Sequence, residues 1–179
     1  MRTLIISYDL AQPHRNKHIL AQQIIFSQIN VGHSSEAEYM MDKWDGYPQA
    51  RKRLVDNIVE TGLRNVVILS GDNHNNWVLD VKQDPNKDES AVIASEFAGT
   101  SLTSGGDGAD LSPQFAPILS KNPQVKFHNS QRGYVRCTVT PEQWTSDYRI
   151  VPYVSKPGAP IQTRATFVVE SGRPGAKRV

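Results

Sequence analysis

The chain has 179 residues, of which 20 are basic and 18 are acidic, so its formal net charge is only +2. This length favours one domain over two, and a charge so close to neutral argues against a protein that binds nucleic acid or another polyanion. The single cysteine, Cys137, excludes an internal disulfide and a cysteine-based zinc site, and the sequence contains neither a membrane span nor a visible signal peptide.

The first third of the sequence predicts a short strand followed by two helices. Residues 3–8, TLIISY, form an apolar, β-favouring run. Residues 17–29 carry leucine and isoleucine at close to helical spacing, which predicts a helix. A second helix is predicted from Pro48 to about Thr61, because proline suits a first helical turn and Gly62 follows where a C-terminal cap belongs.

A buried strand with a candidate metal site is predicted next. Residues 66–69, VVIL, form a continuous apolar run that ends at Ser70-Gly71, which is typical of a central strand. Asp72 and His74 follow at the carboxyl end of this strand, where open α/β sheets bind their ligands. Their oxygen and nitrogen donors suit Zn, Fe, Mn or Ca. Two ligands do not complete a metal site, and the alternative is a pair that only caps and solvates a turn.

The second half of the sequence predicts mainly β-structure. Strands are predicted at residues 77–82 and 91–98, followed by a Gly/Ser-rich segment, residues 99–113, which lacks the spacing of a P-loop and is predicted to be flexible. Alternating patterns predict an antiparallel meander of three strands at residues 134–139, 148–154 and 164–169. Alternation with valines assigns Cys137 to the core, and the basic segment 172–179 is predicted to be a solvated tail.

Six segments of this sequence, in this order, resemble the C-terminal half of the PhoD-like alkaline phosphatases: WDGYPQARKRL, NVVILSGDNHNNW, SEFAGTS, NPQVKF, RGYVRCTVTPEQW and DYRIV. The similarity runs from about Gln22 to about Gly175. It implies an α/β (α+β) fold, namely part of a calcineurin-like metallophosphoesterase αββα sandwich with a C-terminal antiparallel β meander. It also implies a metal-dependent hydrolase that cleaves phosphomonoesters and phosphodiesters through a metal-activated hydroxide.

The resemblance implies a role for three residues, and the role of a fourth, Arg132, is inferred from the chemistry of its side chain. Asp72 and His74 match the metal ligands of the family's GDxH motif, and Tyr134 matches a tyrosine that the family uses as a phenolate ligand to ferric iron. Fe³⁺ and Ca²⁺ are therefore the expected metals, with Zn, Mn or Mg as alternatives. A phenol with a pKa near 10 needs a strongly Lewis-acidic ion to stay deprotonated at neutral pH, and Gly133 would let the backbone approach the site. Arg132 is assigned a catalytic contact with a phosphate oxygen, for which a planar bidentate donor is suited. The alternative for Tyr134 is an aromatic residue at a strand edge.

The resemblance also implies ligands that this sequence lacks, namely two aspartates, a cysteine and an asparagine from the N-terminal half of the family. We therefore expect a fragment that binds metal weakly and is inactive or weakly active alone. Residues 1–20 depart from the family and resemble the first strand and helix of CRISPR-associated ferredoxin-like nucleases, with Asp9 after the strand. A fused or mispredicted reading frame with a junction near Leu20 is the corresponding hypothesis. It divides the chain into residues 1–20, a phosphatase part at 21–175 and a tail at 176–179.

Three functions compete at this point. The first is hydrolysis of a phosphoester substrate. The second is a non-catalytic half-domain that binds a partner or self-associates through an exposed sheet edge and an apolar sheet face. The third is a nucleic-acid enzyme, which the near-neutral charge opposes. The family implies a periplasmic or extracellular location, whereas the sequence as given, with no visible signal peptide, predicts the cytoplasm.

Overall fold

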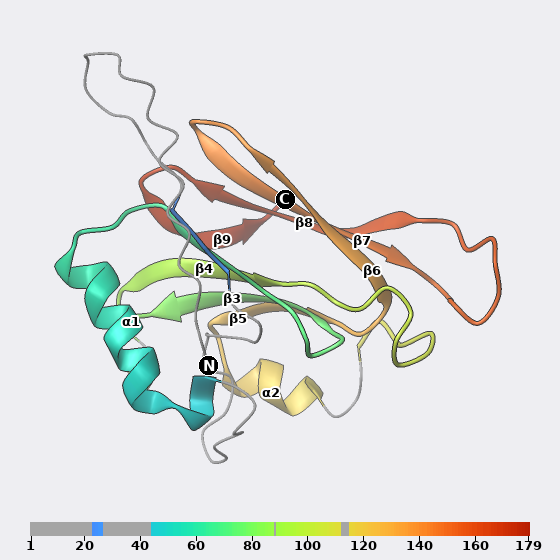
Figure 1. Cartoon of the computed structure of the whole chain (residues 1–179), viewed down its shortest axis with the longest axis horizontal. Helices are drawn as coiled ribbons and strands as arrows, with labels where there is room; N and C mark the ends of the chain where they lie inside the picture. Colours follow the sequence, from blue (N-terminus) through green and yellow to red (C-terminus); the bar gives the residue numbers. More distant parts are fainter. Residues whose placement is uncertain (1–22, 27–43, 88, 112–114) are drawn as a thin grey trace.

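The structure, a computed structural model, describes residues 23–26, 44–87, 89–111 and 115–179 (Figure 1). Its elements in chain order are β1 (Gln23–Phe26), the 3-10 turn η1 (Trp44–Gly46), α1 (Pro48–Glu60), β2 (Val66–Ser70), β3 (Asn76–Lys82), β4 (Val92–Ala98), α2 (Ala116–Lys121), β5 (Val125–Asn129), β6 (Arg132–Val139), β7 (Gln143–Val151), β8 (Gln162–Glu170) and β9 (Arg173–Arg178). In these ranges no helix is long and apolar enough to cross a membrane.

The strands form two sheets. The first has the order β1-β2-β4-β3-β5, in which β1, β2 and β4 are parallel and β3 is antiparallel to both of its neighbours. Because two antiparallel steps restore the direction, β5 runs the same way as β2 and β4. The second sheet, β6-β7-β8-β9, is antiparallel throughout. The carboxyl ends of β2, β4 and β5 therefore meet at one edge of the first sheet.

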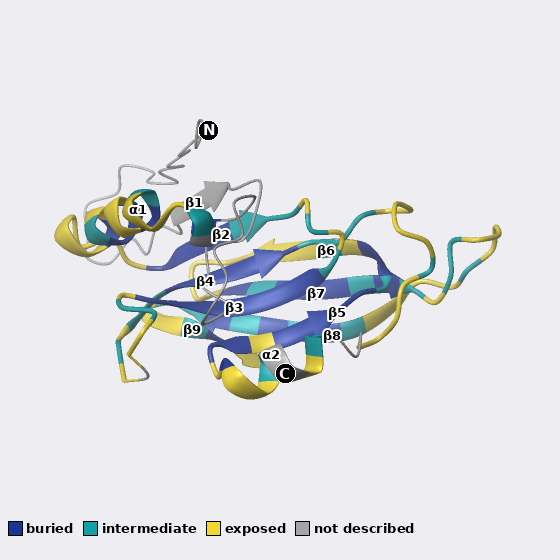
Figure 2. Cartoon of the chain, turned by 90° about the horizontal axis from the view of Figure 1, so that it is seen from below, coloured by how far each residue is buried: buried dark blue, intermediate teal, exposed yellow. Residues whose placement is uncertain are grey.

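The described part forms three layers: helices, first sheet and second sheet (Figures 1 and 2). Apolar residues of α1 pack on one end of the first sheet, in a cluster made of Trp44, Leu54, Ile58, Val66, Ile68, Val81 and Ala94. Residues before and on α2 pack on the same face around β3 and β5, in a cluster made of Trp77, Leu79, Ala98 and Val125 with Phe115 and Leu119. This arrangement confirms the predicted α+β class and a partial sandwich.

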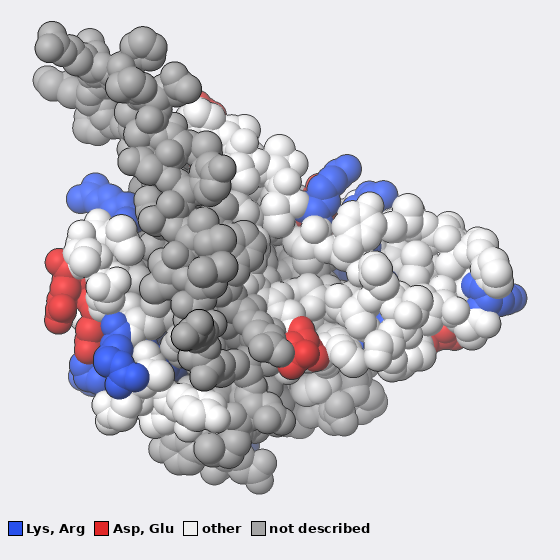
Figure 3. Space-filling model, viewed as in Figure 1, with Lys and Arg blue, Asp and Glu red and all other residues white. Residues whose placement is uncertain are grey.

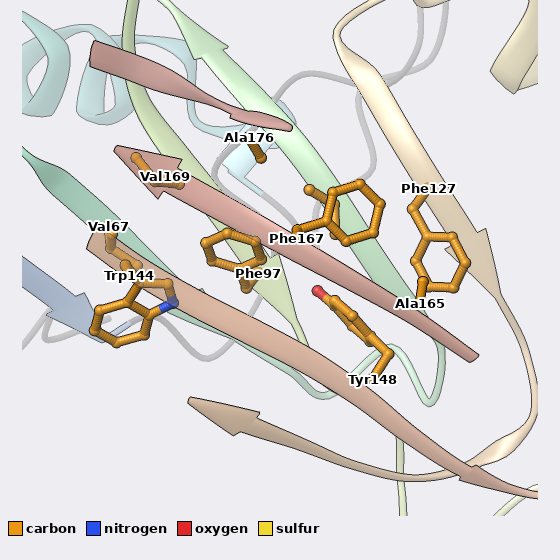
Figure 4. Close-up of a cluster of buried hydrophobic side chains, with 10 residues drawn as sticks. Val67, Phe97, Phe127, Trp144, Tyr148, Ala165, Phe167, Val169 and Ala176 are labelled. Carbon is orange, nitrogen blue, oxygen red and sulfur yellow. The ribbon is translucent and has the colours of Figure 1, made fainter. Parts of the chain in front are cut away.

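The second sheet covers the other face of the first sheet through the largest apolar cluster (Figure 4). Phe127 of the first sheet lies 5.1 Å from Tyr148 and 5.6 Å from Phe167 between ring centroids, and both partners belong to the second sheet. Tyr148 is fully buried, and its hydroxyl donates a 2.6 Å hydrogen bond to the backbone oxygen of Trp77. The two sheets therefore share one interior.

The predicted helix at residues 48–61 is confirmed as α1, and its end has a clear physical cause. Gly62 adopts a φ of +64°, its N–H bonds the carbonyl of Val59, and the N–H of Leu63 bonds the carbonyl of Ile58. These two bonds form a Schellman motif, which glycine favours because it has no Cβ. The chain then turns directly into β2, the strand that carries the candidate metal ligands.

The structure corrects the other helix prediction. The helix expected at residues 17–29 is wrong over Gln23–Phe26, which form β1 and pair in parallel with β2. Consecutive isoleucines are compatible both with the apolar face of a helix and with a strand, and pairing with β2 favours the strand. The strand expected at residues 3–8 lies outside the described residues.

Two predictions about the C-terminal half are also wrong. The segment predicted to be a tail contains β9, which pairs with β8, and its Ala176 is buried and donates its N–H to Asp80. The predicted three-stranded meander therefore has four strands. Cys137 is exposed rather than part of the core, because the inward-facing side of β6 is only partly covered beyond Val135.

Candidate metal centre

Three loops converge at the edge where the carboxyl ends of β2, β4 and β5 meet. Residues 71–75 join β2 to β3, residues 99–111 leave β4, and residues 130–131 join β5 to β6. The N–H of Gly99 donates to the carbonyl of Ser70, which ties the first two loops together at their bases. This edge is the expected position for a ligand site in a sheet with parallel strands.

Asp72 and His74 lie in the first of these loops, and both are exposed. Their φ angles are +66° and +54°, in the left-handed region that few residues other than glycine adopt. Each such residue costs about 1–2 kcal/mol of backbone strain. Strain of this kind in exposed polar residues is found in many functional loops, and the role of Asp72 and His74 as metal ligands stays a prediction.

The loop is held in this conformation by the segment that follows β4. The hydroxyl of Thr100 donates a 3.0 Å hydrogen bond to the backbone oxygen of His74. The backbone N–H of Thr100 donates to Oδ1 of Asn76, at 3.1 Å. Within the loop, Nδ2 of Asn75 donates to the backbone oxygen of Asn73, at 2.8 Å. The strained loop is thus fixed both internally and from a neighbouring segment.

Two buried asparagines lie beneath the loop. Asn76 is 1% exposed and Asn129 is fully buried, and Nδ2 of Asn76 donates to Oδ1 of Asn129 at 3.1 Å. Asn129 in turn donates from its own Nδ2 to the carboxylate of Asp110, at 3.0 Å. A buried amide is tolerated only when its polar atoms are hydrogen-bonded, and these bonds join the three loops into one network.

Arg132, the residue assigned a catalytic phosphate contact, is 3% exposed. Its guanidinium donates to Oγ of Ser101 at 2.7 Å, to the backbone oxygen of Ser104 at 2.6 Å and to the backbone oxygen of Ser130. Burial lowers the pKa of Arg132 from its usual value. In the structure this side chain connects residues 99–111 to β6, and a direct contact with phosphate stays a prediction.

Gly105 brings Arg132 and His74 into the same small region. A Cβ at Gly105, which has a φ of +91°, would lie 3.2 Å from Nη1 of Arg132 and 3.9 Å from Nδ1 of His74. The guanidinium and the imidazole therefore flank the same loop residue. The loop after β4, predicted to be merely flexible, instead forms one wall of the candidate centre.

Two aspartates attach this wall to β8 and to the connection between β7 and β8. Hydrogen bonds from the backbone N–H groups of Val154 and Ser155 lower the pKa of Asp107. The side chain of Arg164 lowers the pKa of Asp110 through a bidentate contact. Both carboxylates are thus stabilised in the charged form that makes these contacts.

Tyr134 occupies a different environment from the loop residues. On β6 it alternates with Val135, which packs into the interior between the sheets, so Tyr134 points to the opposite face. It is 44% exposed and pairs across the strands with Arg149. In the described ranges no contact joins Tyr134 to Asp72 or His74, and its role as a metal ligand stays a prediction.

The donors carried by this loop fit part of a metal site. Asp72 and His74 offer one carboxylate and one imidazole from the same exposed loop. Among the residues that the structure describes, no group of three or more His, Cys, Asp and Glu side chains could hold a metal ion. Asp72 and His74 therefore stay a predicted pair of ligands that does not by itself complete a metal site.

Charges elsewhere on the surface are mixed in sign. Over α1, at the left of Figure 3, basic and acidic groups lie side by side, and Lys52 contacts Asp56 at 2.6 Å. Exposed pairs of this kind contribute little to stability. The site is thus distinguished by its loop geometry and polar network rather than by a concentration of charge.

His128 lies beside the network on β5 and is a packing residue. It is 5% exposed, between the rings of Trp77 and Phe115, with centroid distances of 4.3 and 4.4 Å. Nε2 lies 3.3 Å from Oγ of Ser130, the residue whose carbonyl accepts from Arg132. Burial lowers the pKa of His128 from 6.5 to about 4.

This shift predicts a specific acid sensitivity. Between pH 6.5 and about 4 the unfolded chain binds a proton on His128 that the folded protein does not bind, so the free energy of unfolding falls as pH falls through that window. His128→Phe keeps an aromatic ring without a titrating group, and we expect it to lose this part of the pH dependence. Urea unfolding of both proteins at about pH 7 and about pH 5 measures the difference. Equal pH dependence in the two proteins would contradict the assignment.

The sequence did not indicate that several further residues belong to the site, namely Asn76, Thr100, Ser101, Asp110 and Asn129. A buried asparagine in the run DNHNNW looks the same as an exposed loop asparagine, and a Ser/Thr/Gly segment looks flexible by composition. The available signal was positional, because polar residues follow each of three strands whose carboxyl ends share an edge.

Comparison with known proteins agrees with this fold. The PhoD-like phosphatase family model matches residues 6–148. Alkaline phosphatase D of Bacillus subtilis (strain 168) is 48% identical over 162 residues, which cover 90% of this chain and 28% of that protein. A solved structure described as "Structure of PhoD" superposes with a TM-score of 0.84 at 44% identity, covering 88% of this chain and 31% of that one.

The family match begins at residue 6, within the segment that was expected to be unrelated. The resemblance of that segment to CRISPR-associated nucleases is therefore not supported, and a domain boundary near residue 20 stays a prediction. The chain spans less than a third of the length of the two relatives. Because the family model covers most of the described core and the candidate site, this chain belongs to the PhoD-like phosphatase family.

Proposed function

We propose that this chain contributes Asp72 and His74 to the metal centre of a PhoD-like phosphatase that hydrolyses phosphoesters. The observation that carries the proposal is the loop after β2, where a carboxylate and an imidazole stand at two left-handed backbone positions beside the polar network. Alkaline phosphatase D, to which the chain is similar over 162 residues, supports the substrate class.

The residues have separate roles in this proposal. Asp72 and His74 would hold the metal, for which Fe³⁺ and Ca²⁺ are proposed, with Zn²⁺, Mn²⁺ or Mg²⁺ as alternatives. A bound ion of this kind acidifies water and polarises a phosphoryl oxygen. Arg132 organises the wall formed by residues 99–111 through its bonds to Ser101 and Ser104. Tyr134 is proposed as a further ligand, which would require its phenol to turn from the exposed face of β6.

A metal titration tests the ligand assignment. With Mn²⁺ as the probe, calorimetry on the intact chain should detect weak, saturable binding, because two side chains form only part of a coordination sphere. We expect Asp72→Asn and His74→Ala each to reduce the affinity at least about tenfold. Asp56→Asn, an exposed carboxylate on α1, is the matched control and should bind like the wild type. Binding that neither site variant weakens would contradict the proposal.

The catalytic part of the proposal has its own test. We expect little or no hydrolysis of a chromogenic phosphodiester by this chain in Ca²⁺ and Fe³⁺. Robust hydrolysis that Asp72→Ala abolishes would show that the described residues are sufficient for turnover. Robust hydrolysis that persists in Asp72→Ala would separate the activity from this loop.

A binding or self-associating module is the second candidate, favoured by one observation on β6. Cys137 and Val139 occupy inward-facing positions of this strand but are exposed, and in the described ranges β6 pairs only with β7. An apolar strand edge of this kind favours pairing with another chain. Size-exclusion chromatography over a range of concentrations tests it: a concentration-dependent shift that Val139→Lys removes supports the module, and a constant monomer counts against it.

A further inference from the structure

A residue of the loop after β4, Thr100, contacts the backbone of His74. His74 is exposed and has a φ of +54°, so its own packing provides little to keep it in the left-handed region. The 3.0 Å bond from Oγ1 of Thr100 to the backbone oxygen of His74 acts directly on that conformation. It orients the peptide unit that follows the candidate ligand.

Thr100 is itself fixed from below. Its N–H donates to Oδ1 of Asn76, whose Nδ2 donates to Oδ1 of Asn129. Both amides are at most 1% exposed, and Asn129 is also bonded to Asp110. Buried amides whose polar atoms are all hydrogen-bonded have defined orientations, so contacts with the interior set the position of the Thr100 backbone.

We infer that Thr100 is a positioning residue for the metal centre: it holds the His74 backbone in the left-handed conformation and thereby directs the imidazole toward the same ion as the Asp72 carboxylate. The inference rests on the proposed function for the identity of the ligand. Hydrogen bonds that orient ligands typically change metal affinity by 10- to 100-fold. Asn76 and Asn129 act through Thr100 and touch neither ligand side chain in this arrangement.

The test compares three variants of the intact chain. Thr100→Val keeps the shape of the side chain and removes the hydroxyl, Thr100→Ser restores the hydroxyl, and Thr103→Val changes an exposed threonine of the same loop as a control. Two quantities are measured: the affinity for Mn²⁺, and the three-bond HN–Hα coupling of His74 without metal, which reports its φ angle. We expect Thr100→Val to weaken Mn²⁺ binding about tenfold and to shift the coupling. Thr100→Ser and Thr103→Val should resemble the wild type.

The two readouts separate the inference from the proposed function. A wild-type chain that binds no Mn²⁺ refutes the proposed function, while a coupling that shifts only in Thr100→Val still supports the positioning role. A coupling that stays unchanged in Thr100→Val overturns the positioning role, even if Mn²⁺ binds. Equal Mn²⁺ affinity in Thr100→Val and the wild type overturns it as well. Loss of binding in Thr100→Ser as large as in Thr100→Val would also contradict it, because the hydroxyl would then not be the group that matters.

Discussion

Replacing Arg132 by methionine should lower the free energy of unfolding by about 2–4 kcal/mol and release the loop after β4. Methionine keeps the length of the side chain but donates no hydrogen bond, so the backbone oxygens of Ser104 and Ser130 lose their charged donor. Ser130 is buried, and a buried polar group left without a partner costs about 1–3 kcal/mol. Loss of the bonds to the more exposed Ser101 and Ser104 adds about 1 kcal/mol. Urea unfolding measures the stability, and hydrogen exchange of the amides at residues 100–106 measures the release of the loop.

Arg136→Met is the matched control for this variant. Arg136 lies four residues further along β6, and it bonds Asp147 on the exposed face of the second sheet. The Arg136 side chain is largely exposed, and Asp147, although buried, keeps its hydrogen bond from Thr166, so we expect a loss of about 1 kcal/mol with the loop still protected. Equal effects of the two substitutions would show that Arg132 does not organise the loop. Unchanged stability in Arg132→Met, with lost turnover in an active relative, would instead favour the direct phosphate contact.

Replacing Gly133 by alanine should destabilise the fold by about 3–5 kcal/mol. A Cβ at this position would fall well inside van der Waals contact of the backbone oxygen of Arg149 on the neighbouring strand β7. Gly133 also has a φ of +156°, at the limit of the region that side chains avoid. Backbone strain costs about 1–3 kcal/mol, and forced displacement of a packed strand adds about 1–3 kcal/mol.

Gly172→Ala separates strain from the close approach. Gly172 has a φ of +76°, but a Cβ there would meet nothing within 4 Å. Only the strain applies, so we expect a loss of about 1–2 kcal/mol in the same urea experiment. Similar losses at the two positions would mean that the approach of β6 to β7 is not what requires glycine at residue 133.

The sequence predicted the elements whose patterns are local. α1 ends where Gly62 caps it, and β2 delivers Asp72 and His74 to a loop, because cap and strand signals depend on neighbouring residues. Gly133 was predicted to let the backbone approach the metal site. In the structure Gly133 lies close to the backbone of β7 instead. The sequence does not show this contact, because strand pairing depends on residues far away in the chain.

The remaining errors have the same origin. Residues 172–179 read as a basic tail, yet β9 is held by pairing with β8 and by the bond from Ala176 to Asp80, neither of which is visible locally. Cys137 alternates with valines, which predicted a core position. Whether that position is buried depends on how far the first sheet extends beneath β6, which no local pattern shows. The network of Thr100, Asn76 and Asn129 joins three loops that only the sheet order brings together.

The central claim is that the loop after β2 binds a metal ion in a PhoD-like phosphatase fold. Adding Mn²⁺ to the ¹⁵N-labelled chain tests it most directly, because the paramagnetic ion broadens the amide resonances nearest to it. Our account predicts that the resonances of residues 71–75 broaden first, followed by those of Thr100 and Gly105, whose positions flank His74. Broadening centred on another part of the chain, with residues 71–75 unaffected, would contradict it.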